Sequence, residues 1–216
     1  PEFTNDIVDK LEKNQYRFMP FRSPAAIELY DYAEKIMQKK ITIHPNGVLS
    51  KVLDSNKDQK IMENHEFKNF FCLLIAAGND TTRYSIAMAL YLIANNPKLL
   101  SDLKTNDYWD TAPDEFIRLA SPTMYFRRTA TCDNVLGNAE IKKNDKVILW
   151  FVSGNRDKSV FRNPHQAILS RNPNPHVSFG QGGVHFCLGI WLARMEVKVL
   201  LQELSKKIQS IKALDE

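Results

Sequence analysis

One cysteine near the end of the chain, Cys187, stands in a glycine-rich stretch whose composition suits it to bind a metal. The stretch runs from Phe179 to Gly189 and reads FGQGGVHFCLG. Glycine permits backbone conformations and close approaches that a Cβ would forbid, so this loop can lie against a flat ligand. We expect it to pass directly into an amphipathic helix, whose free amides and dipole would favour the thiolate of Cys187. Because a thiolate is a good soft ligand for iron, Cys187 is a candidate iron ligand.

Two other interpretations of this stretch stay open on its local sequence. A lone cysteine after an apolar residue is usually a small buried hydrophobic side chain, and a glycine-rich turn before a helix often binds an anion. A phosphate site is poorly supported, since the stretch lacks the Gly-Lys-Ser/Thr ending of a phosphate-binding loop and the spacing of a dinucleotide turn. The loop alone therefore supports metal ligation and a structural turn about equally.

A second group of polar side chains interrupts the longest helical pattern in the chain. Residues 62–95 hold no proline and one glycine, with apolar residues spaced by threes and fours, and residues 70–78 are apolar all round. We therefore expect a helix in the middle of the protein. A glycine there costs about 1 kcal/mol relative to alanine, so Gly78 suggests that something approaches the backbone. The helix would open locally, with Thr81 holding water and Asp80 relaying protons. The alternative is a polar turn in which the threonine bonds back to a carbonyl.

The remaining patterns predict a mainly helical chain with small β-sheets. The run after Cys187 predicts a final long helix whose apolar face consists of Leu188, Trp191, Leu192, Met195, Val199 and Leu204. Thr111 is expected to cap a helix in a capping-box-like arrangement with Asp114. Residues 1–22 are read as mostly loop and residues 153–178 as irregular. The other expected helices cover 23–37, 48–53, 62–95 and 98–103, and the expected strands are 123–131 and a more buried one at 147–152, joined through turns at 136–138 and 143–145.

Composition places the chain among globular proteins and limits its partners. It has 216 residues and a net charge of +4, which comes from dispersed lysines and arginines. A solvated surface explains this, a docking face for an acidic electron-transfer partner is a minor alternative, and nucleic acid is not expected. The three cysteines are odd in number and widely spaced, which favours a reducing compartment. With no stretch long enough for a membrane span and no secretory signal, we expect no membrane anchor and a cytoplasmic location.

The glycine-rich stretch resembles the haem-ligating loop of the cytochrome P-450 monooxygenases. The resemblance rests on the Phe-Gly-x-Gly pattern, on the histidine two residues before Cys187 and on the glycine two residues after it. One departure is that Phe179 lies eight residues before Cys187, where the commonest form of the motif has seven. The longer loop resembles a bacterial branch that hydroxylates steroid side chains and methyl-branched lipids, and the extra glycine would displace the aromatic ring that shields the sulfur.

Two further motifs of the family occur upstream in the same order. Gly78, Asp80 and Thr81 match its oxygen-activation motif. Glu115 and Arg118 are three residues apart, so they share a helix face, although an exposed pair of this kind is worth only about 0.3 to 0.5 kcal/mol and is common. In the family this pair meets a second arginine from the irregular segment, and Arg171 occupies the matching place. The resemblance implies a structural charge network that holds the cysteine loop in register.

The resemblance also implies roles for other residues. Arg128 and His185 would contact the haem propionates, although an edge-strand charge that discourages aggregation explains Arg128 equally well. The remaining implied cofactor-binding residues are Phe179, Gly180, Gly183, Gly189, Ala77 and Gly78, and the implied substrate-lining residues are Ala76, Thr123, Met124, Tyr125 and Phe126.

The implied fold is the C-terminal half of the cytochrome P-450 fold, mainly α with small β-sheets, built on one long central helix and a cysteine loop followed by a long helix. Residues 1–216 would be the C-terminal portion of a single domain whose N-terminal portion is absent, with the haem-ligating loop at 179–189. The implied function is hydroxylation of a hydrophobic substrate, a steroid, branched lipid or terpenoid, by haem b and O2, with electrons from a ferredoxin or flavodoxin-type reductase system. The competing hypothesis is a non-catalytic C-terminal module without haem that self-associates as a homo-oligomer over exposed apolar surface.

Overall fold

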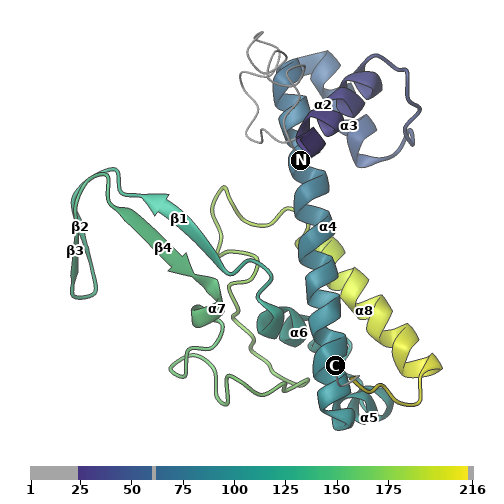
Figure 1. Ribbon diagram of the computed structural model, residues 1–216, viewed down its shortest axis with the longest axis vertical. Coiled ribbons are helices and arrows are strands. Elements are labelled where there is room, and N and C mark those ends of the chain that lie inside the picture. Colours follow the sequence, from purple (N-terminus) through teal and green to yellow (C-terminus); the bar gives the residue numbers. More distant parts are fainter. Residues whose placement is uncertain (1–23, 60–61, 214–216) are drawn as a thin grey trace. The chain divides into compact units, whose positions relative to one another are not determined.

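The computed structural model describes residues 24–59 and 62–213. They divide into two compact units, one ending at Ala77 and one beginning at Gly78, and the long helix α4 (Asn64–Asn95) contributes to both. The described residues are mainly helical with two small antiparallel sheets, as predicted (Figure 1). The loop expected over residues 1–22 and the expected helix start at Ser23 lie outside the described residues.

The first unit packs α2 (Pro24–Met37) against the beginning of α4. The predicted stripe of α2 is confirmed, because its buried residues recur at helical spacing. Helix α3 (Val48–Gln59) runs further than the expected 48–53. The buried residues of this unit form two clusters, Ala26, Ile27, Tyr30 and Cys72 in one, and Ala33, Ile36, Phe67 and Phe71 in the other.

The all-apolar residues 70–78, expected in a helix in the middle of the protein, are not covered on every side by the described residues. Phe71 and Cys72 are buried, but Leu73 and Ile75 are 55% and 43% exposed. Within the described residues, neighbours cover one face of this helix only, and an all-apolar sequence does not reveal which faces are covered.

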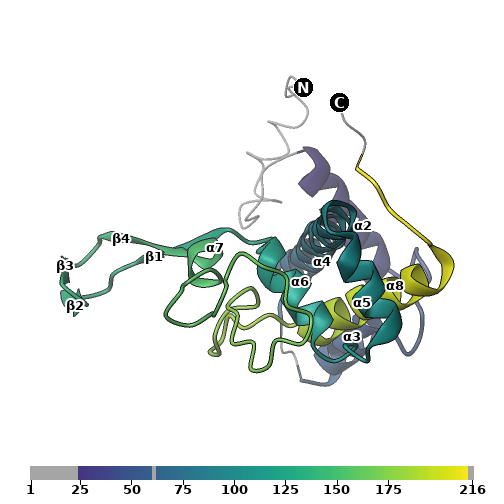
Figure 2. The same cartoon turned by 90° about the horizontal axis from the view of Figure 1, so that it is seen from below.

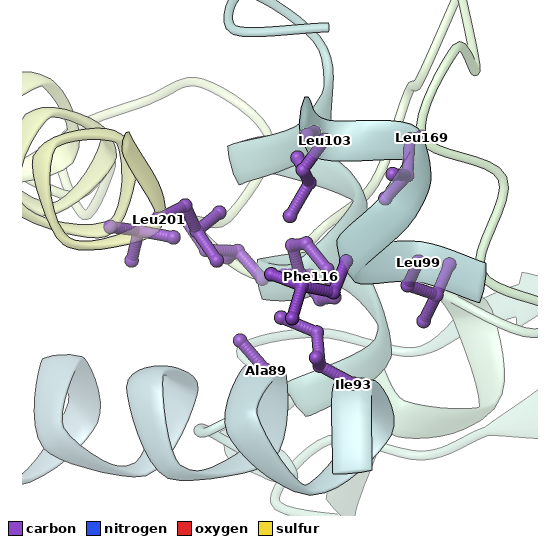
Figure 3. Close-up of a cluster of buried hydrophobic side chains, with 11 residues drawn as sticks. Ala89, Ile93, Leu99, Leu103, Phe116, Leu169 and Leu201 are labelled. Atoms are coloured by element: carbon purple, nitrogen blue, oxygen red, sulfur yellow. The ribbon is translucent and has the colours of Figure 1, made fainter. Parts of the chain in front are cut away.

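The second unit is organised around Phe116, which is fully buried. Figure 3 shows this ring among side chains from four helices: α4, α5 (Pro97–Thr105), α6 (Ala112–Ala120) and α8 (Ile190–Lys207). Leu169, from the irregular segment before the cysteine loop, joins the same cluster. This core therefore fixes that segment against the helices. The buried members are Ala89, Ile93, Leu99, Leu100, Leu103, Ala112, Phe116, Ile117, Leu169, Val197 and Leu201.

The apolar face predicted for the final helix is wrong except at Leu204, which packs against the core cluster. The buried residues of α8 are Ile190, Val197 and Leu201, whereas Trp191 is 75% exposed and Met195 is 53% exposed. The helix has apolar residues on more than one face, so the 3.6-residue period does not select the buried one.

Two hairpins form the β-structure. β1 (Tyr125–Thr129) pairs antiparallel with β4 (Lys146–Trp150), and β2 (Asn134–Leu136) pairs with β3 (Ala139–Ile141) around a turn at Gly137. The second hairpin lies at the far end of the first, away from the helices of this unit (Figures 1 and 2). The turn at 136–138 was predicted, but β2 and β3 were missed, because three residues are too few to show alternation.

The expected strands were too long, and the second one is not buried. β1 covers five of the nine predicted residues, and β4 ends at Trp150. The next residues form α7 (Phe151–Gly154), whose helical turn directs the side chain of Asn155 into the protein. Both strands belong to a two-stranded sheet, so their side chains remain exposed, Trp150 by 53%.

Candidate functional site

Helix α6 carries a fully buried ion pair between Glu115 and Arg118. Two hydrogen bonds of 2.8 Å join the guanidinium Nε and Nη2 to the two carboxylate oxygens, and neither side chain is exposed. Helical spacing of three residues places the two groups on one face. Burial opposes ionisation of Glu115, but hydrogen bonds from Arg118, Ile168 and Arg171 outweigh it and hold the pKa of this carboxyl below its usual value.

The irregular segment between residues 155 and 174 closes over this pair. Arg171 donates from Nε to Glu115 at 2.9 Å, and the amide of Ile168 donates to the other carboxylate oxygen at 2.9 Å. Arg118 in turn donates to the carbonyls of Asn155 and Pro164 at 2.7 and 2.8 Å. The structure thus brings Glu115, Arg118 and Arg171 together. A buried charge network of this kind fixes a segment that has no regular secondary structure.

Asn155 is a second fixed point that sequence reasoning missed. The side-chain Nδ2 of Asn155 donates to the hydroxyls of Ser121 and Ser178 at 2.9 and 2.8 Å. The side-chain Oδ1 accepts from the backbone amide of Val177 at 2.7 Å. It is completely buried. Its side chain therefore joins the end of α6 to the residues that enter the cysteine loop.

The predicted cap of α6 is wrong in its hydrogen bonds. Thr111 occupies the N-cap position but makes no side-chain cap, and its hydroxyl donates instead to the carbonyl of Leu169 at 2.5 Å. Asp114 accepts from Nε of Arg194 at 2.7 Å and lies 3.2 Å from Nε2 of His176. Burial would raise the pKa of Asp114, but these two partners outweigh it and lower that pKa. A charged partner binds a carboxylate more strongly than a backbone amide does, which accounts for the difference.

The cysteine loop is closed by a backbone hydrogen bond between its ends. The amide of Cys187 donates to the carbonyl of Phe179 at 3.0 Å. Gly180, Gly182 and Gly183 have positive φ angles of 80°, 69° and 76°, which side chains with a Cβ rarely adopt. Glycine at these three positions therefore lets the loop make its tight reversal without backbone strain.

The thiol of Cys187 is half-buried and lies before the final helix, not at its first turn. Helix α8 starts at Ile190 with Gly189 as its N-cap residue, so the loop passes directly into a helix as predicted, but Cys187 lies three residues before the first helical residue. The amide of Cys187 is bonded to the carbonyl of Phe179 and not to a group of the helix.

The polar residues of α4 are placed differently from the expectation. The helix is continuous through Gly78, so the predicted local opening is not present. Nothing lies within 4 Å of the position that a Cβ would take at Gly78 among the described residues. Asp80 is exposed and pairs with Arg83 at 2.5 Å. The hydroxyl of Ser85 donates to the carbonyl of Thr81 at 2.9 Å.

The other predicted site residues lie on exposed surfaces of the two units. Arg128 lies on β1 with its guanidinium 5.5 Å from the ring centroid of Phe126, and His185 lies in the cysteine loop. The edge-strand interpretation of Arg128 therefore stays open. Among the predicted substrate-lining residues, Met124, Tyr125 and Phe126 are 56%, 51% and 48% exposed, Thr123 is half-buried and Ala76 is exposed, as are the predicted cofactor-binding residues Ala77 and Gly78.

The model of the cytochrome P-450 family matches residues 25–207. The chain belongs to the cytochrome P-450 family. The match includes the long helix, the buried Glu115–Arg118 pair and the cysteine loop.

Curated relatives of the chain include two kinds of hydroxylase. It is 38% identical over 188 residues to the methyl-branched lipid omega-hydroxylase of Mycobacterium tuberculosis strain H37Rv, covering 86% of this chain and 44% of that protein. It is 34% identical over 190 residues to the steroid C26-monooxygenase of Mycolicibacterium smegmatis, covering 88% of this chain and 44% of that protein. The chain therefore spans less than half the length of these relatives.

Solved cytochromes P-450 have the same fold over about half of their length. A Mycobacterium marinum cytochrome P-450 in complex with pseudoionone is 36% identical and has a TM-score of 0.79, covering 93% of this chain and 50% of that one. The tirandamycin C-bound P-450 monooxygenase TamI is 29% identical with a TM-score of 0.80, covering 90% and 48%. Both likenesses confirm the predicted fold class.

The surroundings of Cys187 fit the haem that cytochromes P-450 use. Among the described residues there is no group of three histidine, cysteine or carboxylate side chains that could hold a metal. The backbone at Gly182 and Gly183 faces open space, and Phe186 and Leu188, the residues before and after Cys187 in sequence, have exposed apolar side chains. A single half-buried thiol flanked by apolar side chains suits a flat apolar ring.

In the part of the chain that the structure describes, no helix is both long and apolar enough to cross a membrane. The expected cytoplasmic location stays a prediction.

Proposed function

We propose that this chain forms the haem-binding portion of a monooxygenase that hydroxylates a hydrophobic lipid. The observation that carries the proposal is the loop that presents Cys187. Its backbone closes through the hydrogen bond to Phe179, and the segment before it is anchored to the buried Glu115 through Arg171. The branched-lipid and steroid hydroxylases among the relatives support a steroid or methyl-branched chain as the substrate, and terpenoids are a second class.

Each group of residues has a separate task in this proposal. Cys187 binds the iron as a thiolate, and Phe179 restrains the loop through its carbonyl. Arg128 and His185 bind the propionates. Asp80 and Thr81 hold water and pass protons toward the substrate side. The haem, when bound, supplies the electron-transfer and oxygen chemistry that no side chain in this chain provides.

O2 and a ferredoxin or flavodoxin-type reductase system are the co-substrate and the electron source in the proposal. The net charge of +4 favours an acidic partner, although these charges are dispersed. The acidic partner is tested by mixing the haem-loaded protein with a reduced acidic ferredoxin and measuring the rate of iron reduction at low and high salt. Reduction of the iron should slow steeply as salt rises, and a salt-independent rate would argue against an electrostatic docking face.

The decisive experiment is haem reconstitution of the wild-type chain and two cysteine variants. The reduced, carbon monoxide-bound wild type should show the strongly red-shifted Soret band of thiolate ligation. Cys187→Ser should lose this band, whereas Cys132→Ser, which changes an exposed cysteine in the connection between β1 and β2, should keep it. A red-shifted band that survives Cys187→Ser would remove this residue as the ligand.

The substrate class is tested on the same reconstituted protein. A steroid with an intact side chain and a methyl-branched fatty acid are titrated in turn, and displacement of water from the iron is followed as a shift of the Soret band. A saturable shift with either compound supports the proposed class. A shift with neither, but with a short terpenoid, would redirect it.

The second candidate is a non-catalytic, self-associating module. The observation that favours it is the exposed apolar surface of α8, where Trp191, Leu192, Met195 and Val199 are at least 50% exposed. Protein that stays colourless after reconstitution and sediments as an oligomer supports the module. Coloured monomeric protein supports the monooxygenase.

A further inference from the structure

Phe179 connects the cysteine loop to three polar side chains, Arg194, His176 and Asp114, to which the sequence assigned no role at the loop. Its carbonyl accepts the amide of Cys187 at 3.0 Å. Its ring contacts the guanidinium of Arg194, 5.5 Å from the ring centroid, and the imidazole of His176, whose centroid is also 5.5 Å away at an interplanar angle of 52°. The ring and the carbonyl belong to one residue, so whatever restrains the ring also restrains the hydrogen bond to Cys187.

Asp114 restrains both neighbours of this ring with one oxygen atom. Its Oδ1 accepts from Nε of Arg194 at 2.7 Å and lies 3.2 Å from Nε2 of His176. The other imidazole nitrogen, Nδ1, accepts from the amide of Ser178 at 3.4 Å, so a proton on Nε2 satisfies both contacts. His176 is almost completely buried, and Asp114 and Arg194 are 20% and 30% exposed. The pair on Arg194 is thus partly shielded from solvent, where charge-assisted hydrogen bonds are strong.

Packing alone does not hold the ring of Phe179. One part of the ring contacts the core cluster around Phe116. Another part borders a hollow of about 340 Å³, which Gly180, Gly182 and Arg194 also line. The glycines that follow Phe179 have no side chains to pack, so the polar contacts supply restraint that the loop itself lacks.

We propose that Asp114 is a positioning residue for Cys187. It fixes Arg194 and His176, these fix the ring of Phe179, and the carbonyl of Phe179 fixes the amide of Cys187 and so the direction of the thiol. The adjacent Glu115 anchors the irregular segment, so two successive carboxylates of α6 hold two successive parts of the chain. The positioning role rests on the proposed function only in that the thiol is the haem ligand.

The test compares Asp114→Asn with Asp110→Asn in the haem-free chain. Asp110 pairs with Lys198 of the same helix α8 at 2.8 Å, but it is 94% exposed, so it is a matched control. Two rates are measured: peptide-resolved hydrogen exchange over residues 179–190 and alkylation of Cys187 read by mass spectrometry. Loss of a charge-assisted hydrogen bond should raise both rates about tenfold in Asp114→Asn, with no change in Asp110→Asn or in alkylation of Cys132. An unchanged loop, or a rise over the whole chain, overturns the proposal.

A second variant, Arg194→Gln, keeps the proposal testable if Asp114→Asn fails to fold. It removes the charged partner of Asp114 but keeps the contact between Asp114 and His176. It should raise the same two rates, and Arg194→Lys should restore part of the restraint. In haem-loaded protein both changes at Asp114 and Arg194 should increase the fraction whose carbon monoxide band lacks the thiolate shift. A chain that takes up no haem defeats the proposed function, while the exchange result still decides whether Asp114 positions the loop.

Discussion

Glu115 and Arg118 lie one turn apart on α6 and form a bidentate ion pair in which neither side chain is exposed to solvent. The pair anchors the irregular segment that leads to Cys187, which bonds to it through Arg171, Ile168 and several carbonyls.

Replacing Glu115 by Gln should strongly destabilise the protein. The change keeps the size of the side chain but leaves Arg118 buried without its counter-charge, which costs about 3 to 5 kcal/mol. The measurement is urea unfolding followed by circular dichroism. Glu203→Gln is the control, because Glu203 pairs with Lys206 and Lys207 on an exposed surface and its loss should leave the midpoint unchanged. Equal midpoints for the two variants would contradict the structural role of the network.

Acid should destabilise the protein in a window set by two carboxyl groups. The pKa values of Asp114 and Glu115 are lowered in the folded state, so their contribution is present above the ordinary carboxyl range, about pH 4. It is lost as the pH falls through that range toward the lower folded-state pKa values. The urea midpoint measured from pH 7 downward should fall below about pH 4. Asp114→Asn should flatten this fall, and an equally steep fall in the variant would contradict the assignment.

Phe116→Ala should open a cavity in the second unit. The ring is completely buried among residues of four helices, and such truncations cost about 3 to 5 kcal/mol. Thermal or urea unfolding measures the loss. Phe126→Ala is the control on an exposed hairpin, with an expected cost of about 1 kcal/mol or less. A decrease of the free energy of unfolding in Phe116→Ala as small as that in the control would mean that the core repacks without the ring.

Asn155→Ala should loosen the entrance to the cysteine loop. It removes the partner of two hydroxyl groups and one amide in a buried site, at about 1 to 3 kcal/mol for each group left unpaired. Hydrogen exchange of the Val177 amide should accelerate more than the average of the chain. Asn134→Ala, on exposed β2, should not change that amide, and parallel acceleration in both variants would argue against a local effect.

In haem-loaded protein, Thr81→Ala should lower the fraction of the consumed reductant that yields hydroxylated product. The proposed role of Thr81 is to hold water for proton delivery, so its loss should increase the peroxide released per reductant consumed by several-fold. Haem content should not change. Thr131→Ala, in the loop after β1, is the control. Unchanged peroxide release would remove Thr81 from the proton path.

The helices could be predicted from sequence because their buried residues repeat along the chain. In α2 the stripe is complete enough to show which face is buried. In α8 apolar residues occur on several faces, and the predicted face was the exposed one. The strands β2 and β3 are too short for any period to be seen.

The candidate site was predictable only where its parts are close in sequence or belong to a known motif. Spacing alone places Glu115 beside Arg118, while the place of Arg171 came from resemblance. The contact of Asp114 with His176 spans 62 residues, and local reasoning instead assigned Asp114 to a helix cap. Short polar residues suit both uses, and only the tertiary fold selects one.

Asn155 has a consequence for the order in which the second unit folds. Its partners Ser121 and Val177 are 34 and 22 residues away in sequence, so its hydrogen bonds require two large loops to close together. The helices around Phe116 meet the same requirement, since α6 bonds to α8 through Asp114 and Arg194, which are 80 residues apart. We therefore expect the core of this unit and the segment that ends at Cys187 to form together, in one late step of folding.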